Sequence, residues 1–258
     1  MTKSIVNLRV VQNQALSALY SLLKLTPTDG VTLPAMLPGQ FVQVEISQSK
    51  NTFLRRPISI CNVDVENNEL WLLVRKAGEG TASLIASAEG DVVNVILPLG
   101  NGFSMPAPEQ KNLLLIGGGV GVAPLLQLGK SLRKNGFEPS FLLGARSVSD
   151  LLLVDEFEKV GHVYLSTDDG SVGEVGVVTQ HSCLSNCSWD MIYCCGPAPM
   201  MKAVVGVARN IGASCEVSLE NMMACGLGAC LCCVEKTVKG NVCVCTEGPV
   251  FNIEDLTW

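Results

Sequence analysis

Four cysteines near the end of the chain constrain the fold more strongly than any other part of the sequence. They are spaced as Cys225-x4-Cys230-x2-Cys233, and eleven residues separate Cys233 from Cys245. The first three have the spacing of a plant-type [2Fe–2S] loop, in which short turns with glycine let thiolates converge on two irons. A fourth thiolate from a returning strand would close the second iron. The spacing therefore predicts a loop that holds an iron–sulfur cluster.

Disulfides and zinc are the two alternatives for these cysteines. A secreted chain would open with a basic and then an apolar segment, and MTKSIVNLRVVQNQ has neither, so free thiols in the cytoplasm are expected. Structural zinc sites favour two Cys-x2-4-Cys pairs, whereas the second close pair here is Cys243-x-Cys245. The pattern favours the cluster over zinc. Cys232 and Cys243 fit neither spacing and are interpreted as its buried neighbours.

Composition bounds the kind of protein and its partners. The 258 residues leave room for two domains and a small appendage, and 48% of them are hydrophobic while 16% are charged. The net charge is −6 without a run of like charges, which argues against nucleic acid as a partner. The longest uncharged stretch, 112–129, is rich in glycine, so we expect no membrane span. The low charge content favours a surface that is partly covered by another subunit.

Residues 1–103 have the pattern of an antiparallel barrel. Short strand-like segments alternate with turn signals, and a single helix is expected over Thr81–Ala88 with Thr81 as its cap. The predicted strands are Phe41–Ile46, Pro57–Val63, Glu69–Arg75 and Asp91–Leu97.

Residues 104–213 change to strands alternating with helices, which predicts a parallel sheet with helices on both faces. The predicted strands are Asn112–Gly118, Pro139–Ala145, His162–Thr167 and Asp190–Gly196, and a helix is expected over Ala123–Gly136. The remaining segment, 214–258, carries the cysteines after a strand over Ala213–Glu220. The fold class predicted from the whole chain is thus multidomain β plus α/β, with a small C-terminal [2Fe–2S] domain.

Two motifs in the α/β part suit a dinucleotide. Glycines between a buried strand and a helix let the backbone approach a pyrophosphate at the helix N-terminus, and the alternative is a simple tight turn. The residues of this motif are Gly117, Gly118, Gly119, Gly121 and Pro124. The string that ends the last predicted strand, Cys195-Gly196-Pro197, lies where a nicotinamide ring would lie. Cys195 is a candidate to pack against that ring, and the alternative is that its thiol only fills space.

Two motifs in the barrel suit a ligand that carries phosphate groups and a ring. Arg56-Pro57-Ile58-Ser59 places a guanidinium for a phosphate and a hydroxyl for a ring nitrogen along one strand. Gly80-Thr81, at a helix start, offers a second phosphate cradle. An exposed end of an edge strand is the alternative for the arginine motif.

These motifs in this order resemble the ferredoxin–NADP reductase superfamily. RRPISI, RKAGEGT, LPLGNGF and SLENMMACGLGACLCCVE…CTEGPVF together resemble the electron-transfer subunits of heteromeric, NAD-dependent (class 1B) dihydroorotate dehydrogenases over nearly the whole chain. The resemblance implies FAD held by Arg56–Ser59, Leu73, Val74, Arg75, Gly80 and Thr81. It implies Cys225, Cys230, Cys233 and Cys245 as cluster ligands, although Cys243 lies two residues from Cys245 and could replace it.

The resemblance also implies a function. Such a subunit pairs with an FMN-containing catalytic subunit, as a 2+2 heterotetramer, and passes electrons from that FMN through [2Fe–2S] and FAD to NAD in pyrimidine biosynthesis. Ser59 and Cys195 are the residues expected beside the reacting rings. A related NAD(P)H-oxidising subunit of a hydrogenase, sulfite reductase or transhydrogenase complex is the first alternative, and a zinc-binding regulatory protein is the second. Arg146-Ser147 leaves NADP open as the nucleotide.

Overall fold

The structure is a computed structural model that describes residues 2–47, 49 and 51–258. It divides into two compact units. The first comprises Met1–Gly102, Asn221–Glu235 and Asn241–Pro249, and the second comprises Phe103–Glu220, Lys236–Gly240 and Val250–Trp258. The cysteine segment therefore belongs with the barrel residues, while β15 (Val250–Asn252) and the end of the chain belong with the α/β residues.

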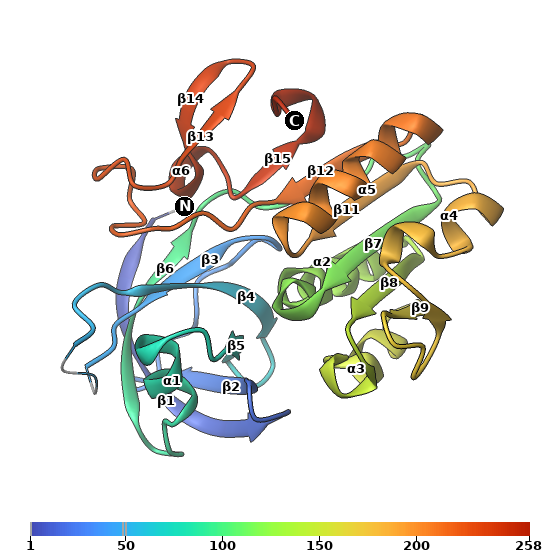
Figure 1. Ribbon diagram of the computed structural model, residues 1–258. Helices are drawn as coiled ribbons and strands as arrows, with labels where there is room; N and C mark the ends of the chain where they lie inside the picture. Colours follow the sequence, from blue (N-terminus) through green and yellow to red (C-terminus); the bar gives the residue numbers. More distant parts are fainter. Residues whose placement is uncertain (1, 48, 50) are drawn as a thin grey trace. The chain divides into compact units, whose positions relative to one another are not determined.

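In the first unit, antiparallel strands close into a barrel with the order β1-β2-β5-β4-β3-β6 (Figure 1). The strands are β1 (Ser4–Ala15), β2 (Tyr20–Pro27), β3 (Phe41–Val44), β4 (Arg56–Asp64), β5 (Glu69–Arg75) and β6 (Val92–Leu99). Alternate residues such as Val42 and Val44 fill the barrel with apolar side chains. The predicted antiparallel barrel is confirmed, and the prediction omitted β1 and β2.

The helix of the barrel unit, α1, spans Glu79–Ile85 and starts two residues before the predicted one. The prediction that Thr81 caps it is wrong, because Gly78 is the N-cap and Thr81 lies inside the first turn. There its Oγ1 accepts from the backbone N–H of Ala77 at 2.8 Å. The helix ends three residues before the predicted end, and there Asn13 Nδ2, on β1, donates to the carbonyls of Ile85 and Ser87.

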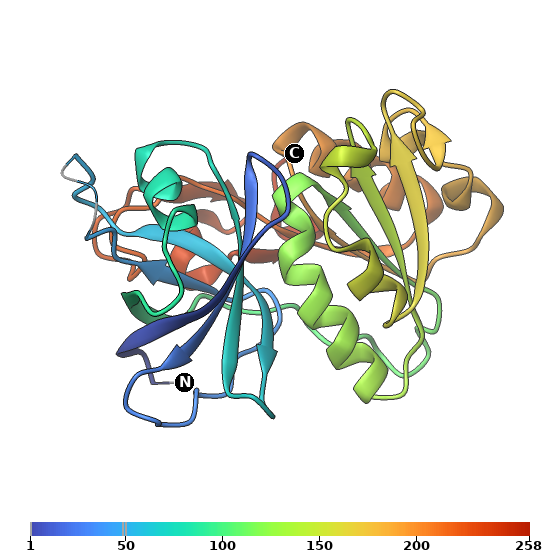
Figure 2. The ribbon, with the colours of Figure 1, turned by 90° about the horizontal axis from the view of Figure 1, so that it is seen from below.

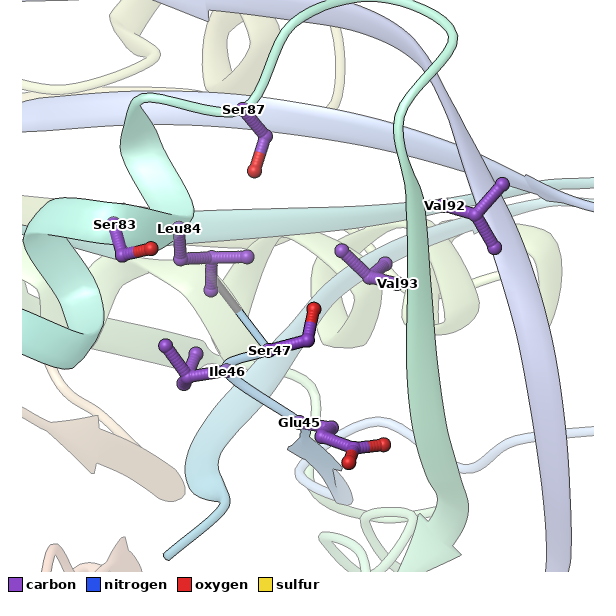
Figure 3. A pocket seen from close by; sticks show the side chains of 8 residues that line it. All are labelled: Glu45, Ile46, Ser47, Ser83, Leu84, Ser87, Val92 and Val93. Carbon is purple, nitrogen blue, oxygen red and sulfur yellow. The ribbon is translucent and has the colours of Figure 1, made fainter. Parts of the chain in front are cut away.

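A small hollow lies beside α1 in the barrel unit (Figure 3). Among the described residues that line it, none is a predicted FAD residue, and we assign it no function. Its lining residues are Glu45, Ile46, Ser47, Ser83, Leu84, Ser87, Val92 and Val93.

In the second unit, a seven-stranded sheet has the order β10-β9-β8-β7-β11-β12-β15. Its strands are β7 (Leu113–Gly118), β8 (Pro139–Ala145), β9 (His162–Thr167), β10 (Glu174–Val175), β11 (Met191–Cys195), β12 (Ser214–Ser218) and β15. The strands from β10 to β12 are parallel, and β15 pairs antiparallel with β12. The predicted parallel sheet is confirmed, and β12 and β15 carry it beyond residue 213.

Helices cover both faces of this sheet, as predicted. Helix α2 connects β7 to β8, and α5 connects β11 to β12, which lies in the opposite direction along the sheet. Because both crossovers are right-handed, the two helices lie on opposite faces (Figure 2). The helices are α2 (Ala123–Lys134), α3 (Val154–Glu158), α4 (Cys183–Asn186) and α5 (Ala198–Ile211), and the prediction omitted α5.

The cysteine segment contributes little regular structure. β13 (Val234–Thr237) and β14 (Gly240–Cys243) form a two-stranded ribbon, and the short helix α6 (Val244–Glu247) follows directly. Among the described residues, none of the helices is both long enough and apolar enough to cross a membrane.

Candidate functional site

The four predicted cluster ligands come together in the barrel unit as two pairs. The backbone N–H of Cys230 donates to Cys225 Sγ at 3.4 Å, and the N–H of Cys245 donates to Cys233 Sγ at 3.4 Å. The first pair is on the outside, since Cys230 is exposed, whereas Cys233 and Cys245 are buried. This grouping of two and two is the one that a cluster with two irons requires.

The loop that carries the first pair is shaped by left-handed residues. Gly226 and Gly228 have φ values of +69° and +83°, and Leu231 has +57°. This conformation turns successive N–H groups inward, so that Leu227 donates to Cys225 Sγ at 3.3 Å and Gly228 to Cys245 Sγ at 3.2 Å. A left-handed leucine is strained, and such strain is concentrated at functional sites. The loop is therefore built to direct N–H donors at sulfur.

The thiols differ in electrostatic environment. Hydrogen bonds from the backbone, foremost that of Leu227, lower the pKa of the Cys225 thiol to about 6 because they stabilise the thiolate. Burial raises the pKa of the Cys245 thiol to about 12. Iron deprotonates a thiol that coordinates it, so the protonated state of Cys245 does not oppose a role as ligand.

The donor set fits a [2Fe–2S] cluster. Thiolates are the soft ligands that such clusters use, and backbone N–H groups here already approach three of the four sulfurs. Within the part of the chain that the structure describes, no three His, Cys, Asp or Glu side chains converge as a single metal ion would need. A binuclear cluster instead distributes its ligands over two irons, and the four thiols remain the predicted ligands.

The two spare cysteines differ from the prediction. Cys232 is exposed and Cys243 is half-buried, so the interpretation of both as buried neighbours is wrong. Cys232 lies between two predicted ligands, Cys230 and Cys233. Cys243 is close to Cys233, and burial foremost raises the pKa of its thiol. It lies at the end of β14, immediately before α6, the helix that carries Cys245.

The residues after β6 hold the cysteine segment on the barrel. Asn101 Nδ2 donates to the carbonyls of Thr246 and Glu247, both at 3.0 Å, and its backbone N–H donates to Gly248 O at 2.6 Å. These contacts satisfy carbonyls at the end of α6 that have no partner within the helix. The prediction gave Asn101 no role, although it lies inside the LPLGNGF string.

The two predicted FAD motifs of the barrel also lie side by side. A Cβ on Gly80 would lie 2.7 Å from Arg56 Nε, so the arginine side chain lies directly against the first turn of α1. Arg56 Nη1 donates to Leu54 O at 2.8 Å, which fixes the guanidinium at the start of β4. This close approach makes a cradle in which a cation and the backbone of a glycine turn face the same space.

The other predicted FAD residues lie where β4 and β5 separate. The two strands are paired from Asp64, opposite Glu69, to Ile60, opposite Leu72. Among the described residues, the pairing does not continue to residues 73–75 of β5. The strand residues Arg56–Ser59 pair with β3 instead. Leu73 and Val74 are buried and Arg75 is exposed, so the backbone of this stretch is the part best suited to contact a ligand. These residues fit an FAD site.

The two predicted NAD motifs meet in the second unit. Cys195 and Gly117 are opposite each other in the pairing of β11 with β7. A Cβ on Gly121 would lie 2.5 Å from Gly196 Cα, so the glycine turn and the Cys-Gly-Pro turn are in direct contact. Both lie at the carboxyl ends of parallel strands, where nucleotides bind in such sheets. Gly118 and Gly119 complete the first turn, Pro124 lies in the first turn of α2, and Pro197 is the N-cap of α5.

Cys195 is a neutral thiol in this arrangement. It is 1% exposed, and burial raises its pKa well above the ordinary value. A neutral buried thiol suits a packing contact with a ring rather than proton transfer.

Known proteins carry the same sequence features. The model of the iron-sulfur cluster binding domain of dihydroorotate dehydrogenase B matches residues 220–257, and that of the oxidoreductase NAD-binding domain matches residues 115–206. The dihydroorotate dehydrogenase B (NAD(+)) electron transfer subunit of Lysinibacillus sphaericus is 42% identical over 227 residues, which cover 86% of this chain and 88% of the relative. This chain belongs to that family.

The other comparisons agree with the assignment. The electron transfer subunit of Shouchella clausii is 40% identical over 85% of this chain and 86% of its own. Among solved structures, an NADH-dependent reduced ferredoxin-NADP oxidoreductase, studied for flavin-based electron bifurcation, has a TM-score of 0.86 and 30% identity, and the match covers 97% of this chain and 90% of that one. The comparisons confirm the predicted family, the fold class and the cofactor set of FAD, [2Fe–2S] and NAD.

Proposed function

We propose that this chain is the electron-transfer subunit of an NAD-dependent dihydroorotate dehydrogenase, in which electrons pass from the FMN of a catalytic subunit through [2Fe–2S] and FAD to NAD in pyrimidine biosynthesis. The observation that carries this function is the grouping of Cys225 with Cys230 and of Cys233 with Cys245 in the barrel unit. The identity of about 40% with the electron transfer subunits supports it.

Each cofactor transfers electrons in a different way: NAD accepts only a hydride, a cluster accepts one electron at a time, and a flavin does both. The residues of this chain bind and orient them. Arg56 is proposed to bind an FAD phosphate and Ser59 to donate a hydrogen bond to the flavin ring. Leu73–Arg75, with Pro57, Ile58, Gly80 and Thr81, form the remainder of that site.

The NAD residues of this proposal lie in the second unit. Gly117–Gly121 present backbone N–H groups to the pyrophosphate at the start of α2, and Pro124, which has no backbone N–H, lies in the first turn of that helix. Gly196 and Pro197 leave space for the nicotinamide, and the Cys195 thiol packs against it.

A catalytic dihydroorotate dehydrogenase subunit is the partner that the family implies, and we propose a heterotetramer of two copies of each. Large apolar side chains around the exposed cysteine pair support a covered surface, since Met222 is 84% and Leu231 is 63% exposed. Native mass spectrometry of the two subunits expressed together tests the stoichiometry. We also propose a cytoplasmic location, which the twelve free thiols support.

An anaerobic titration of the purified chain with NADH, followed by visible and EPR spectra, tests the proposed function. We expect the flavin bands to bleach and a rhombic signal of a reduced [2Fe–2S] centre to appear. A folded, colourless protein that contains zinc would refute the proposal and favour the regulatory alternative.

A related module with another partner is the second candidate. The observation behind it is the match to the ferredoxin-NADP oxidoreductase, at 30% identity and a TM-score of 0.86, although the identity of about 40% with the electron transfer subunits is higher. The two are separated by adding either a dihydroorotate-oxidising subunit with dihydroorotate, or reduced ferredoxin, to the NADH-reducible chain and measuring NAD reduction. Turnover with ferredoxin and none with dihydroorotate would favour the second candidate.

A further inference from the structure

Gln43 is a polar side chain on the outer face of the barrel that is nevertheless fully buried. Its neighbours Val42 and Val44 point into the barrel core, so Gln43 on β3 points the opposite way. An outward-facing residue of a barrel is ordinarily exposed, yet the exposed fraction of Gln43 is 0%. The segment that covers it is the cysteine loop, because a Cβ on Gly226 would lie 2.8 Å from both Cγ and Nε2 of Gln43.

The amide of Gln43 has no hydrogen-bond partner among the described residues. Both Nε2 and Oε1 are buried and unpaired, so exchanging the two atoms would not change this. Buried polar groups without partners are rare because they lose their bonds to water, and each one needs an explanation. Gln40 provides the contrast: it is also buried, but its amide accepts from Leu37 N at 2.7 Å and donates to Gly100 O at 2.8 Å.

The position of Gln43 relates it to both candidate sites of the barrel unit. On β3 it pairs with Pro57 of the predicted FAD strand. Its side chain reaches Gly226, the residue that follows the predicted ligand Cys225. Arg55 Nη1 donates to the backbone carbonyl of Gln43 at 3.3 Å and leaves the amide available. An amide with two N–H donors is therefore held against the cluster loop with no acceptor of its own.

We propose that Gln43 is a hydrogen-bond donor to the iron–sulfur cluster: its Nε2–H group donates to sulfur at the Cys225 side of the cluster and raises the reduction potential. The inference rests on the proposed function, because it requires the cluster that Cys225 would hold. Hydrogen bonds to the sulfurs are among the factors that set the potentials of such clusters. The donor stabilises the reduced cluster more than the oxidised one, because the reduced cluster carries one more negative charge.

The test is the midpoint potential of the cluster, measured by EPR in anaerobic redox titrations of the full chain. Gln43→Met keeps the size of the side chain and removes the donor, whereas Gln43→Glu keeps the shape and replaces the donor by an acceptor. Gln40→Met is the matched control, since it removes a buried amide that is fully bonded elsewhere. Pulsed EPR of the wild-type chain with 15N in its glutamine amides is a second measurement that needs no variant.

We expect Gln43→Met to shift the equilibrium between the two cluster states about fivefold to tenfold toward the oxidised one, or about 40–60 mV at 59 mV per tenfold. Gln43→Glu should lower the potential further, and Gln40→Met should leave it unchanged. A weak 15N coupling to the reduced cluster is expected in the wild-type chain and should be lost in Gln43→Met.

An unchanged potential in both Gln43 variants, with iron content and flavin intact, would overturn the inference and leave the proposed function standing. The same shift in Gln40→Met as in Gln43→Met would also overturn it, since loosening of the barrel would then be the cause. If the Gln43 variants do not fold, the absence of a 15N coupling in the wild-type spectrum is decisive against it. A wild-type chain without a cluster would instead refute the proposed function.

Discussion

Replacing Gly226 by alanine tests whether the cysteine loop is fitted tightly to the barrel. Gly226 has a φ of +69°, and a Cβ there would lie 2.8 Å from Cγ and Nε2 of Gln43. Gly226→Ala therefore combines two costs, a left-handed backbone and a collision with a buried side chain. Gly30→Ala is the matched control in the same unit, because Gly30 has a φ of +73° and none of the described atoms lies within 4 Å of its Cβ position.

The two costs have different sizes. A left-handed conformation costs an ordinary residue about 1–2 kcal/mol. Forcing an extra methyl group into a packed region costs about 1–3 kcal/mol more. We therefore expect Gly226→Ala to lower the free energy of unfolding by about 2–5 kcal/mol, and Gly30→Ala by about 1–2 kcal/mol.

Urea denaturation followed by flavin and iron–sulfur absorbance measures both variants, and iron analysis reports retention of the cluster. We expect Gly226→Ala to lose iron and Gly30→Ala to keep it. In a Gln43→Ala background the collision is absent, so the further change Gly226→Ala should cost only the backbone term of about 1–2 kcal/mol. Equal effects of Gly226→Ala and Gly30→Ala, or no relief in the double variant, would refute the reasoning that the loop rests on Gln43.

Cys245→Ser should abolish the EPR signal of the cluster whereas Cys243→Ser should keep it, and the reverse result would exchange the two as ligands. Asn101→Ala, which removes two hydrogen bonds from an exposed side chain to α6, should cost about 1 kcal/mol and speed the release of iron to a chelator; an unchanged release rate would contradict the role of Asn101. Burial lowers the pKa of His181, so the unfolded chain takes up its proton more readily and stability should fall as the pH falls from about 7.5 to about 5.5. Urea midpoints at the two pH values should show that His181→Gln weakens this dependence, and an equal effect of His162→Gln would count against the assignment to His181.

Strands with strong apolar patterns could be predicted to within one residue. The bounds of β5, β8 and β9 agree with the prediction, and those of the fully buried β7 and β11 differ from it by one residue at one end or both, because turn signals on both sides define such strands locally. The end of α1 could not be predicted in this way. The carbonyl of its last residue, Ile85, accepts from Asn13, more than seventy positions away, and no local signal at Ile85 predicts that contact.

The candidate site shows the same division. The glycine turn and the Cys-Gly-Pro turn could be found from their motifs, because each is a local backbone requirement. Gln43 could not, since a glutamine between two valines in an alternating strand is typical of an outward, solvent-facing position. Only the docking of residues about 180 positions later covers it.

The sequence by itself determined which chemistry this protein supports: the spacing of Cys225, Cys230 and Cys233 is a local property of a short loop, and thiolates at that spacing have few uses. The tertiary structure alone decided how the thiols pair and what lies beneath them. Pairing of Cys233 with Cys245 depends on the return of β14 into α6, and the burial of Gln43 depends on a loop folded back onto β3. Both are contacts between segments far apart in the chain, and they exist only when the packed barrel brings those segments together.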